Sequence, residues 1–156
     1  MIVMLDSMIY DKIIENDGFL DVLKRRHSQG TLRIIDTHIQ LDQLSATTDE
    51  CKRTRLLALI EELKLLAVRV PTIGGVWDVT RWDEGTFGSD EENIAIEKAM
   101  NSNPRHSQDA LIAVTAAAHV DYLITEDRPL TNRISSSGLS LKVLTFEGFT
   151  KALGSY

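Results

Sequence analysis

The most constraining feature of this sequence is a continuous apolar run, Met1–Leu5, that is followed directly by an aspartate, Asp6. A strand that is apolar at every position, and not only at alternate ones, is typical of a parallel sheet covered on both faces. Helix-like segments separate this run from later strand-like segments, a pattern that favours crossover connections. The chain is therefore predicted to be an α/β protein with a mostly parallel central sheet.

About five strands are expected, at residues 1–5, 32–35, 68–70, 122–125 and 141–144. Helices are expected at residues 19–26, 37–44, 90–100, 107–119 and 146–153, with one more starting at Pro129. The sequence Thr47 to Glu50 reads as a capping box that opens a long helix whose apolar positions reach Leu66. Pro71 is expected to end the third strand. Residues 72–90, which include Trp77 and Trp82, are expected to form a covering or functional loop.

Length and cysteine content narrow the class of protein. The 156 residues fit one domain, 1–156, that can bury a core without a metal or disulfide staple. The single cysteine, Cys51, excludes an internal disulfide framework and a cysteine-based zinc site, and it fits a cytoplasmic protein. Neither a signal peptide nor an apolar stretch of about 20 residues, the length of a membrane span, is expected.

The formal net charge of −6 works against non-specific binding of nucleic acid, which depends on neutralising phosphates. An RNA-binding role would need a local basic patch or bound cations. The basic clusters that could supply such a patch are residues 24–27 and 52–55.

Three aspartates stand at positions where a parallel sheet would bring them together. Asp6 follows the first strand, Asp127 follows the strand 122–125, and Asp109 lies in the first turn of the helix 107–119. Ligands of open parallel sheets bind beyond the carboxyl ends of the strands, where the strand order reverses. Alternative explanations exist for two of them: Asp127 could cap the following helix, and Asp109 could interact with its own helix dipole.

Clustered carboxylates repel one another unless they hold a cation, and Mg²⁺ and Mn²⁺ prefer oxygen ligands. Such an ion lowers the pKa of bound water and stabilises charge on a phosphoryl oxygen. The sequence contains no Gly-x-x-x-x-Gly-Lys loop and no Gly-x-Gly-x-x-Gly motif for binding nucleotide phosphates. Metal-assisted hydrolysis of a phosphodiester is therefore the predicted reaction class.

Two segments resemble the PIN-domain ribonucleases, in particular the toxin-like VapC-type members. The first is Met1–Ser7, and the second is the sequence Asp-Ala-Leu-Ile-Ala from Asp109, followed by the strand that ends Thr125-Glu126-Asp127. The resemblance covers nearly the whole chain. It implies a three-layer α/β/α sandwich, RNA cleavage that depends on Mg²⁺ or Mn²⁺, and a homodimer. It also implies an antitoxin protein as a partner.

The same resemblance implies that Asp6, Asp109 and Asp127 are metal-site acids, with hydroxyl support from Ser7 and Thr125. The family pattern places an asparagine two residues after the first aspartate, where this chain has Met8. It also has a glutamate in the helix after the second strand. We align that glutamate with Gln43, and Asp42 beside it is a candidate fourth catalytic acid.

Two other functions remain open. A PIN-like protein without the glutamate could be an inactive module that binds RNA or protein. A phosphatase or phosphotransferase could use Asp6 as a nucleophile, but a haloacid-dehalogenase site needs Asp-x-Asp and this chain has Asp6-Ser7-Met8. A metal-dependent endoribonuclease of the toxin-antitoxin kind is the preferred prediction.

Overall fold

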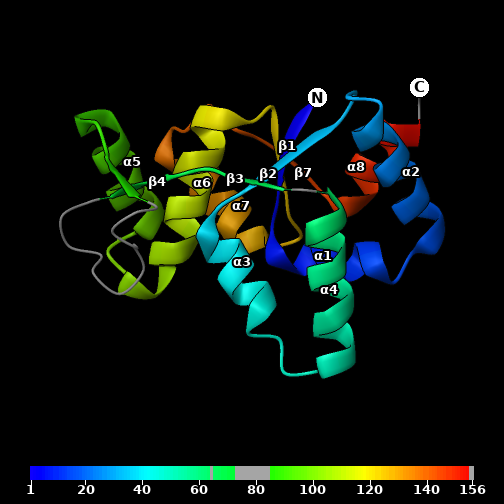
Figure 1. Ribbon diagram of the computed structural model, residues 1–156. Helices are drawn as coiled ribbons and strands as arrows, with labels where there is room; N and C mark the ends of the chain where they lie inside the picture. Colours follow the sequence, from blue (N-terminus) through cyan, green and yellow to red (C-terminus); the bar gives the residue numbers. More distant parts are fainter. Residues whose placement is uncertain (64, 73–84, 155–156) are drawn as a thin grey trace.

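The computed structural model describes residues 1–63, 65–72 and 85–154. Its centre is a parallel sheet with the strand order β3-β2-β1-β6-β7 (Figure 1). The strands are β1 (Ile2–Leu5), β2 (Arg33–Asp36), β3 (Leu66–Ala67), β6 (Tyr122–Ile124) and β7 (Lys142–Leu144). Because β3 has two residues, the other four strands form most of the sheet. The predicted parallel sheet of about five strands is confirmed.

The order of the strands reverses beside β1. The chain runs from β1 outward to β2 and β3, and later returns to place β6 and β7 on the other side of β1. Leu5 is in register with Ile124, and the backbone N–H of Asp6 donates to the carbonyl of Ile124 at 2.9 Å. The carboxyl ends of β1 and β6 therefore meet at the switch point where open α/β sheets bind ligands.

Helices cover both faces of the sheet, as expected for a three-layer α/β/α sandwich (Figure 1). One core includes residues of α1 (Ser7–Ile14), α2 (Asp17–Ser28), α4 (Glu50–Leu63) and α8 (Phe146–Gly154). The other core includes residues of α5 (Asp90–Met100), α6 (Ser107–His119) and α7 (Arg128–Ser137). The remaining helix, α3 (His38–Ser45), contributes Ile39 to the second core and Leu44 to the first.

The apolar run at the start of the chain explains the two cores. Val3 and Leu5 lie in the first core and Met4 lies in the second, because successive side chains of a strand point to opposite faces. All three residues are fully buried. An uninterrupted apolar sequence is therefore what a strand between two helical layers requires.

The helix α1 was not predicted; the segment after Asp6 was interpreted as a short polar region. Its buried residues, Ile9, Tyr10, Ile13 and Ile14, recur at helical spacing. Isoleucine and tyrosine have modest helix propensity, so tertiary burial stabilises this helix more than local preference does.

The predicted start and end of the long helix α4 were wrong. The helix begins at Glu50, and the N–H of Lys52 donates to the Asp49 carboxylate at 2.9 Å, so Asp49 and not Thr47 caps it. The helix ends at Leu63, and Leu66 belongs to β3. Two true capping boxes open other helices, Thr37 with Gln40 and Ser89 with Glu92.

The third predicted strand, residues 68–70, was also placed wrongly. The edge of the main sheet is β3, and Val70 belongs to β4 (Val70–Thr72), which pairs with β5 (Gly85–Phe87) in a separate small sheet. Pro71 lies inside β4 and does not end it. A two-stranded sheet has only edge strands, where proline is tolerated. Trp77 and Trp82, expected in a covering loop, lie outside the described residues.

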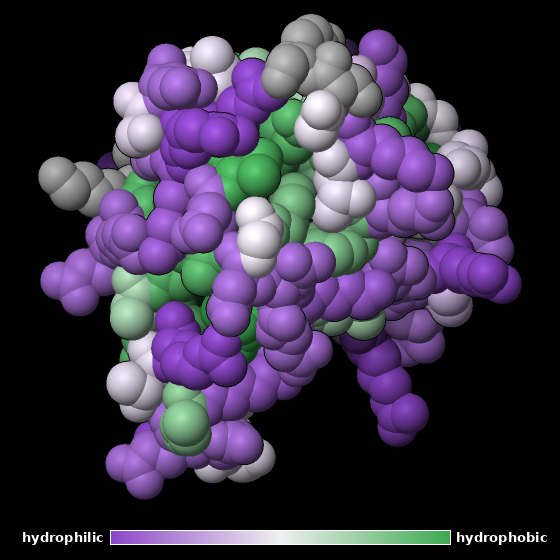
Figure 2. Space-filling view, turned by 90° about the vertical axis from the view of Figure 1, so that its right-hand side faces the viewer, coloured by the Kyte–Doolittle hydropathy of each residue, from purple (hydrophilic) through white to green (hydrophobic). Residues whose placement is uncertain are grey.

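The two predicted basic clusters make structural contacts. Lys24 pairs with Glu62 at 2.7 Å, and Lys52 pairs with Asp11 at 2.8 Å. The guanidinium of Arg26 donates to the carbonyl of Leu153 at 3.1 Å. The first cluster lies on α2, on the face shown in Figure 2, which is mostly hydrophilic with apolar residues exposed in a central recess. Lys24, Lys52 and Arg26 thus tie their helices to other parts of the protein.

A hollow of about 1060 Å³ lies at the amino-terminal end of the strands. Its lining includes Met1, Tyr122, Lys142 and Leu153, and none of the three candidate aspartates. The candidate site is therefore at the opposite end of the sheet. Within the part of the chain that the structure describes, no helix has the length and apolar character needed to cross a membrane.

Candidate functional site

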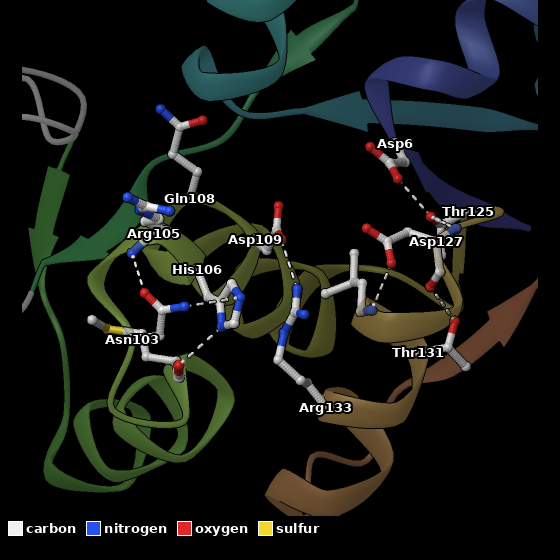
Figure 3. Close-up of polar contacts among 12 residues, drawn as sticks. Asp6, Asn103, Arg105, His106, Gln108, Asp109, Thr125, Asp127, Thr131 and Arg133 are labelled. Carbon is white, nitrogen blue, oxygen red and sulfur yellow. Dashed lines mark hydrogen bonds and ion pairs between the residues drawn. The ribbon is translucent and has the colours of Figure 1, made fainter.

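Asp6 directly follows β1, which ends at Leu5, and immediately precedes α1. It stands at the N-cap of α1 in extended conformation, but its side chain makes no capping hydrogen bond. The carboxylate instead accepts a hydrogen bond from the Thr125 hydroxyl, with 2.5 Å between Oδ2 and Oγ1 (Figure 3). The strand end thus places this acid against β6, and the Ser7 backbone N–H gives the carboxylate a second hydrogen bond.

Thr125 links two of the three aspartates. Its side chain is almost fully buried, and its hydroxyl oxygen also accepts from the backbone N–H of Asp127 at 3.0 Å. The backbone of Thr125 is held in turn by the carbonyl of Leu144 at 3.0 Å. The Thr125 hydroxyl therefore donates its proton to Asp6 and accepts from Asp127 with a lone pair, which sets the positions of the two residues relative to each other.

Asp127 is the N-cap of α7. Its Oδ1 atom accepts from the backbone N–H of Leu130 at 2.8 Å, so the capping role considered from the sequence is real. The cap uses one of the two carboxylate oxygens and fixes the direction of the other (Figure 3). Capping and ligand binding are therefore compatible at this residue.

Asp109 lies in the first turn of α6, as predicted, and faces a cation from a different helix. The Arg133 guanidinium on α7 donates from Nη2 to its Oδ2 at 2.6 Å. The side chains are 35% exposed for Asp109 and 15% exposed for Arg133. Arg133 was not predicted from the sequence. A signal existed, since it lies three residues after the buried Leu130 and so shares the inward face of an amphipathic helix.

The three aspartates act on one another electrostatically. Burial raises the pKa of the Asp6 carboxyl, hydrogen bonds from Thr125 and from the Ser7 backbone lower it, and the charges of Asp109 and Asp127 raise it again. The net effect is a pKa above the ordinary value of 3.8.

Burial also raises the pKa of Asp109, and the charge of Asp127 adds to this effect. The Arg133 and His106 charges and the hydrogen bond from Arg133 lower it, but the net shift is upward. Burial and the charge of Asp127 therefore outweigh the stabilisation that Arg133 gives to the ionised Asp109 carboxylate.

His106 lies at the end of a short 3₁₀ helix, Pro104–His106, that leads into α6. Its ring contacts the carbonyl of Met100 at 3.2 Å and the Asn103 amide at 3.4 Å. Those contacts fix its orientation, and its charge still reaches Asp109. His106 is thus a flanking cation of the site when protonated.

The helix α3 brings two glutamines toward the same region. The buried Gln40 donates from Nε2 to the carbonyl of Leu5 at 2.6 Å, and its Oε1 accepts from the N–H and hydroxyl of Thr37. Gln43, the residue aligned with the family glutamate, donates to Gln108 at 2.9 Å. Gln108 directly precedes Asp109. Both glutamines are neutral, so α3 adds no negative charge to the site through these two positions.

The remaining predicted site residues have peripheral positions. Asp42 is exposed on α3, next to Gln43. Ser7 is half-buried and contacts the Asp6 carboxylate through its backbone N–H. Met8, which stands at the family's asparagine position, is 42% exposed. The hydroxyl support expected for Asp6 thus comes from Thr125.

Among the described residues, no group of three or more histidine, cysteine, aspartate or glutamate side chains is arranged so that it could hold a metal ion. The donors are nevertheless of the right kind, because Asp6, Asp109 and Asp127 offer hard oxygen atoms from three segments within electrostatic range of one another. The principal obstacle is that Asp109 is turned to Arg133. The chemistry of these donors suits a divalent cation, and Asp109 would join the other two acids only after that ion pair opens.

Comparisons with known proteins bear on the fold. A chain in the solved structure of VapBC-1 from nontypeable Haemophilus influenzae superposes with a TM-score of 0.52. The match has 18% sequence identity and covers 94% of this chain and 99% of that chain. No protein-family model matches the sequence, and no curated protein does. This chain thus has the fold of a VapBC-1 chain over nearly its whole length.

Proposed function

We propose that this protein is a metal-dependent endoribonuclease of the PIN type. The observation that carries the proposal is the convergence of Asp6, Asp109 and Asp127 at the switch point of the sheet. The VapBC-1 fold and the sequence resemblance to VapC-type proteins support it. The reaction is hydrolysis: the oxygen of water bonds to phosphorus, and the P–O bond to one neighbouring nucleoside breaks. That nucleoside's oxygen gains a proton, and the other product keeps the phosphate.

Asp6, Asp109 and Asp127 would hold Mg²⁺ or Mn²⁺. When bound, such an ion lowers the pKa of coordinated water and stabilises charge on the phosphoryl oxygens. The protein's own residues fix the acids: Thr125 orients Asp6, and the helix cap orients Asp127. Arg133 pairs with Asp109 beside an otherwise acidic edge, and the charge of His106 also acts on Asp109. These cations would offset the repulsion of RNA by a chain of net charge −6.

The VapC-type resemblance extends the proposal to partners. An antitoxin protein would restrain the nuclease, and two copies of the chain would form a homodimer. Size-exclusion chromatography with light scattering, on the chain alone, measures the second point directly: a monomeric mass across micromolar concentrations contradicts the homodimer.

The decisive experiment incubates the purified protein with structured and single-stranded RNAs in Mn²⁺, Mg²⁺ or EDTA. Asp109→Asn tests the site, and Asp21→Asn, an exposed aspartate on α2, is the matched control. We expect metal-dependent cleavage by the wild type and the control, and at least a hundredfold loss in Asp109→Asn, on the order of what a removed catalytic group costs. Equal cleavage by Asp109→Asn contradicts the assigned site.

A second candidate function is favoured by one observation: α3 presents Gln40 and Gln43, and no acid other than the exposed Asp42, toward this edge. A protein that keeps the fold but has lost a metal-site acid would bind RNA or a protein without cutting. Such a protein would leave the RNA intact in the cleavage assay, in every metal. It would still bind the RNA and slow its migration in a gel-shift experiment.

A further inference from the structure

The ion pair between Arg133 and Asp109 joins two helices at the candidate site. Arg133 comes from the second turn of α7, and Asp109 comes from the first turn of α6. The pair brings a permanent positive charge to a cluster of three carboxylates, because a guanidinium does not lose its proton in proteins. Figure 3 shows the Arg133 side chain reaching up to Asp109 from α7.

The contact is a single hydrogen bond, not a two-point fork. Nη2 donates to Asp109, while the Nε atom is buried with no hydrogen-bond partner in the described structure. Two-point arginine-carboxylate pairs are the stronger and more specific kind. A one-point pair that leaves a buried donor unsatisfied carries a desolvation cost. Another cation can therefore replace Arg133 at Asp109 more easily than it could replace an arginine bound by two hydrogen bonds.

We propose that Arg133 is a built-in counter-cation that competes with the divalent metal for Asp109. This inference rests on the proposed function, since it assumes that the three aspartates hold a metal. In the metal-free protein, Arg133 neutralises Asp109 and lowers the repulsion among the acids. Metal binding at Asp109 requires the ion pair to open. The metal and Arg133 therefore bind Asp109 alternately, and the affinity for metal is lower than the three acids alone would give.

The reciprocity of linkage makes the proposal measurable without any RNA. A cation that weakens metal binding is itself displaced by metal to the same degree. Removing the arginine should therefore tighten metal binding. It should also increase the thermal stabilisation that a given metal concentration produces, because that stabilisation follows the dissociation constant.

The test is calorimetric titration of MnCl₂ into wild type, Arg133→Gln and Arg128→Gln. Arg128, exposed at the start of the same helix, is the matched control because its loss changes the net charge equally without touching the pair. We expect Arg133→Gln to bind Mn²⁺ about tenfold more tightly, within the roughly 5- to 150-fold span of such couplings. Arg128→Gln should change the affinity much less. Equal affinities for Arg133→Gln and wild type overturn the inference, as does no Mn²⁺ binding by either at millimolar concentrations.

A double-mutant cycle isolates the role of Asp109. In an Asp109→Asn background, Arg133→Gln should lose its advantage and behave like Arg128→Gln. If Arg133→Gln still tightened Mn²⁺ binding in the Asp109→Asn background, the effect would come from the change in overall charge. That result would contradict competition for Asp109. If Arg133→Gln does not fold, a crystal structure of the Mn²⁺-bound wild type replaces it. An Arg133–Asp109 contact that persists beside the bound ion overturns the inference.

Measurements of RNA cleavage and RNA binding distinguish a failure of this inference from a failure of the proposed function. Metal-dependent cleavage by the wild type, together with unchanged Mn²⁺ affinity in Arg133→Gln, leaves the nuclease standing and removes only the competition. Weaker RNA binding by Arg133→Gln in EDTA, with unchanged Mn²⁺ affinity, would make Arg133 a phosphate contact and not a competitor. Tighter Mn²⁺ binding without any RNA cleavage would support the competition and contradict the nuclease.

Discussion

The hydroxyl of Tyr10 donates to the carboxylate of Asp36 in the interior of the protein, between α1 and the end of β2. Both side chains are completely buried, and the second oxygen of Asp36 has no hydrogen-bond partner in the described structure. The contact ties α1 to the strand beside β1. Since Asp6 immediately precedes α1, this pair also helps to set the direction of the candidate site.

The buried carboxyl predicts a pH-dependent stability. Burial raises the pKa of Asp36 from 3.8 to about 7, against the opposing effect of the Tyr10 hydrogen bond. The folded state therefore holds a proton that the unfolded state has lost between these values. This contribution to stability is complete below the unfolded pKa and is lost as the pH rises through the folded pKa, by up to about 1.4 kcal/mol per pH unit. Asp36→Asn should flatten urea-unfolding stability between pH 4 and pH 7; a slope equal to that of wild type contradicts the assignment.

Tyr10→Phe tests the same contact from the other side. The substitution keeps the ring and removes the donor, leaving both oxygens of Asp36 without a partner. An unsatisfied buried group costs about 1–3 kcal/mol, and we expect that loss in urea denaturation at pH 7. Tyr122→Phe, at a half-buried ring, serves as the tyrosine control. An equal loss in both variants would show that the hydroxyl of Tyr10 has no special role.

Thr125→Val should affect both stability and catalysis. Valine has nearly the shape of threonine but cannot donate to Asp6 or accept from Asp127. Because the Thr125 hydrogen bond lowers the pKa of Asp6, its loss should raise that pKa further and move the acidic limb of the kcat/KM profile to higher pH. Thr125→Ser keeps the hydroxyl and should retain the wild-type profile. An unshifted acidic limb in Thr125→Val contradicts the positioning role.

Gln40→Glu should destabilise the protein, even though it adds an acid near the site. The amide Nε2 of Gln40 donates to the carbonyl of Leu5, and a carboxylate at this buried position would face that carbonyl without a proton to give. We expect a loss of about 1–3 kcal/mol at pH 7, measured by chemical denaturation. Gln43→Glu, at a half-buried position, should fold with nearly wild-type stability. Similar losses in both variants would contradict the assigned contact of Gln40.

The position of the site could be predicted because it follows from local rules. An apolar run at β1 implies a strand buried on both faces, and parallel strands bring Asp6 and Asp127 to one edge. The Asp109 helix was also predictable, since its sequence is rich in alanine, the strongest helix former. These conclusions needed the order of segments along the chain and no long-range side-chain contacts.

The contacts that define the chemistry were not predictable in the same way. Arg133 and Asp109 are 24 residues apart, and their meeting depends on how α6 packs beside α7. The aligned position of Gln43 did not reveal that Gln40 is the residue that reaches β1. A two-residue strand such as β3 carries too few residues for a pattern, and its assignment depends on pairing with β2.

The contact between Asp6 and Thr125 spans 119 residues. During synthesis, Asp6 leaves the ribosome long before β6 and α7 exist, so the first acid waits through most of translation without its partners. The nearest neighbours of β1 in the finished sheet are the second and the sixth strand to be made. A partly translated chain therefore carries no assembled acidic edge, because Asp6 and Asp127 come together only after the segment around Asp127 has emerged and docked. The topology therefore delays assembly of this edge until translation has passed that point.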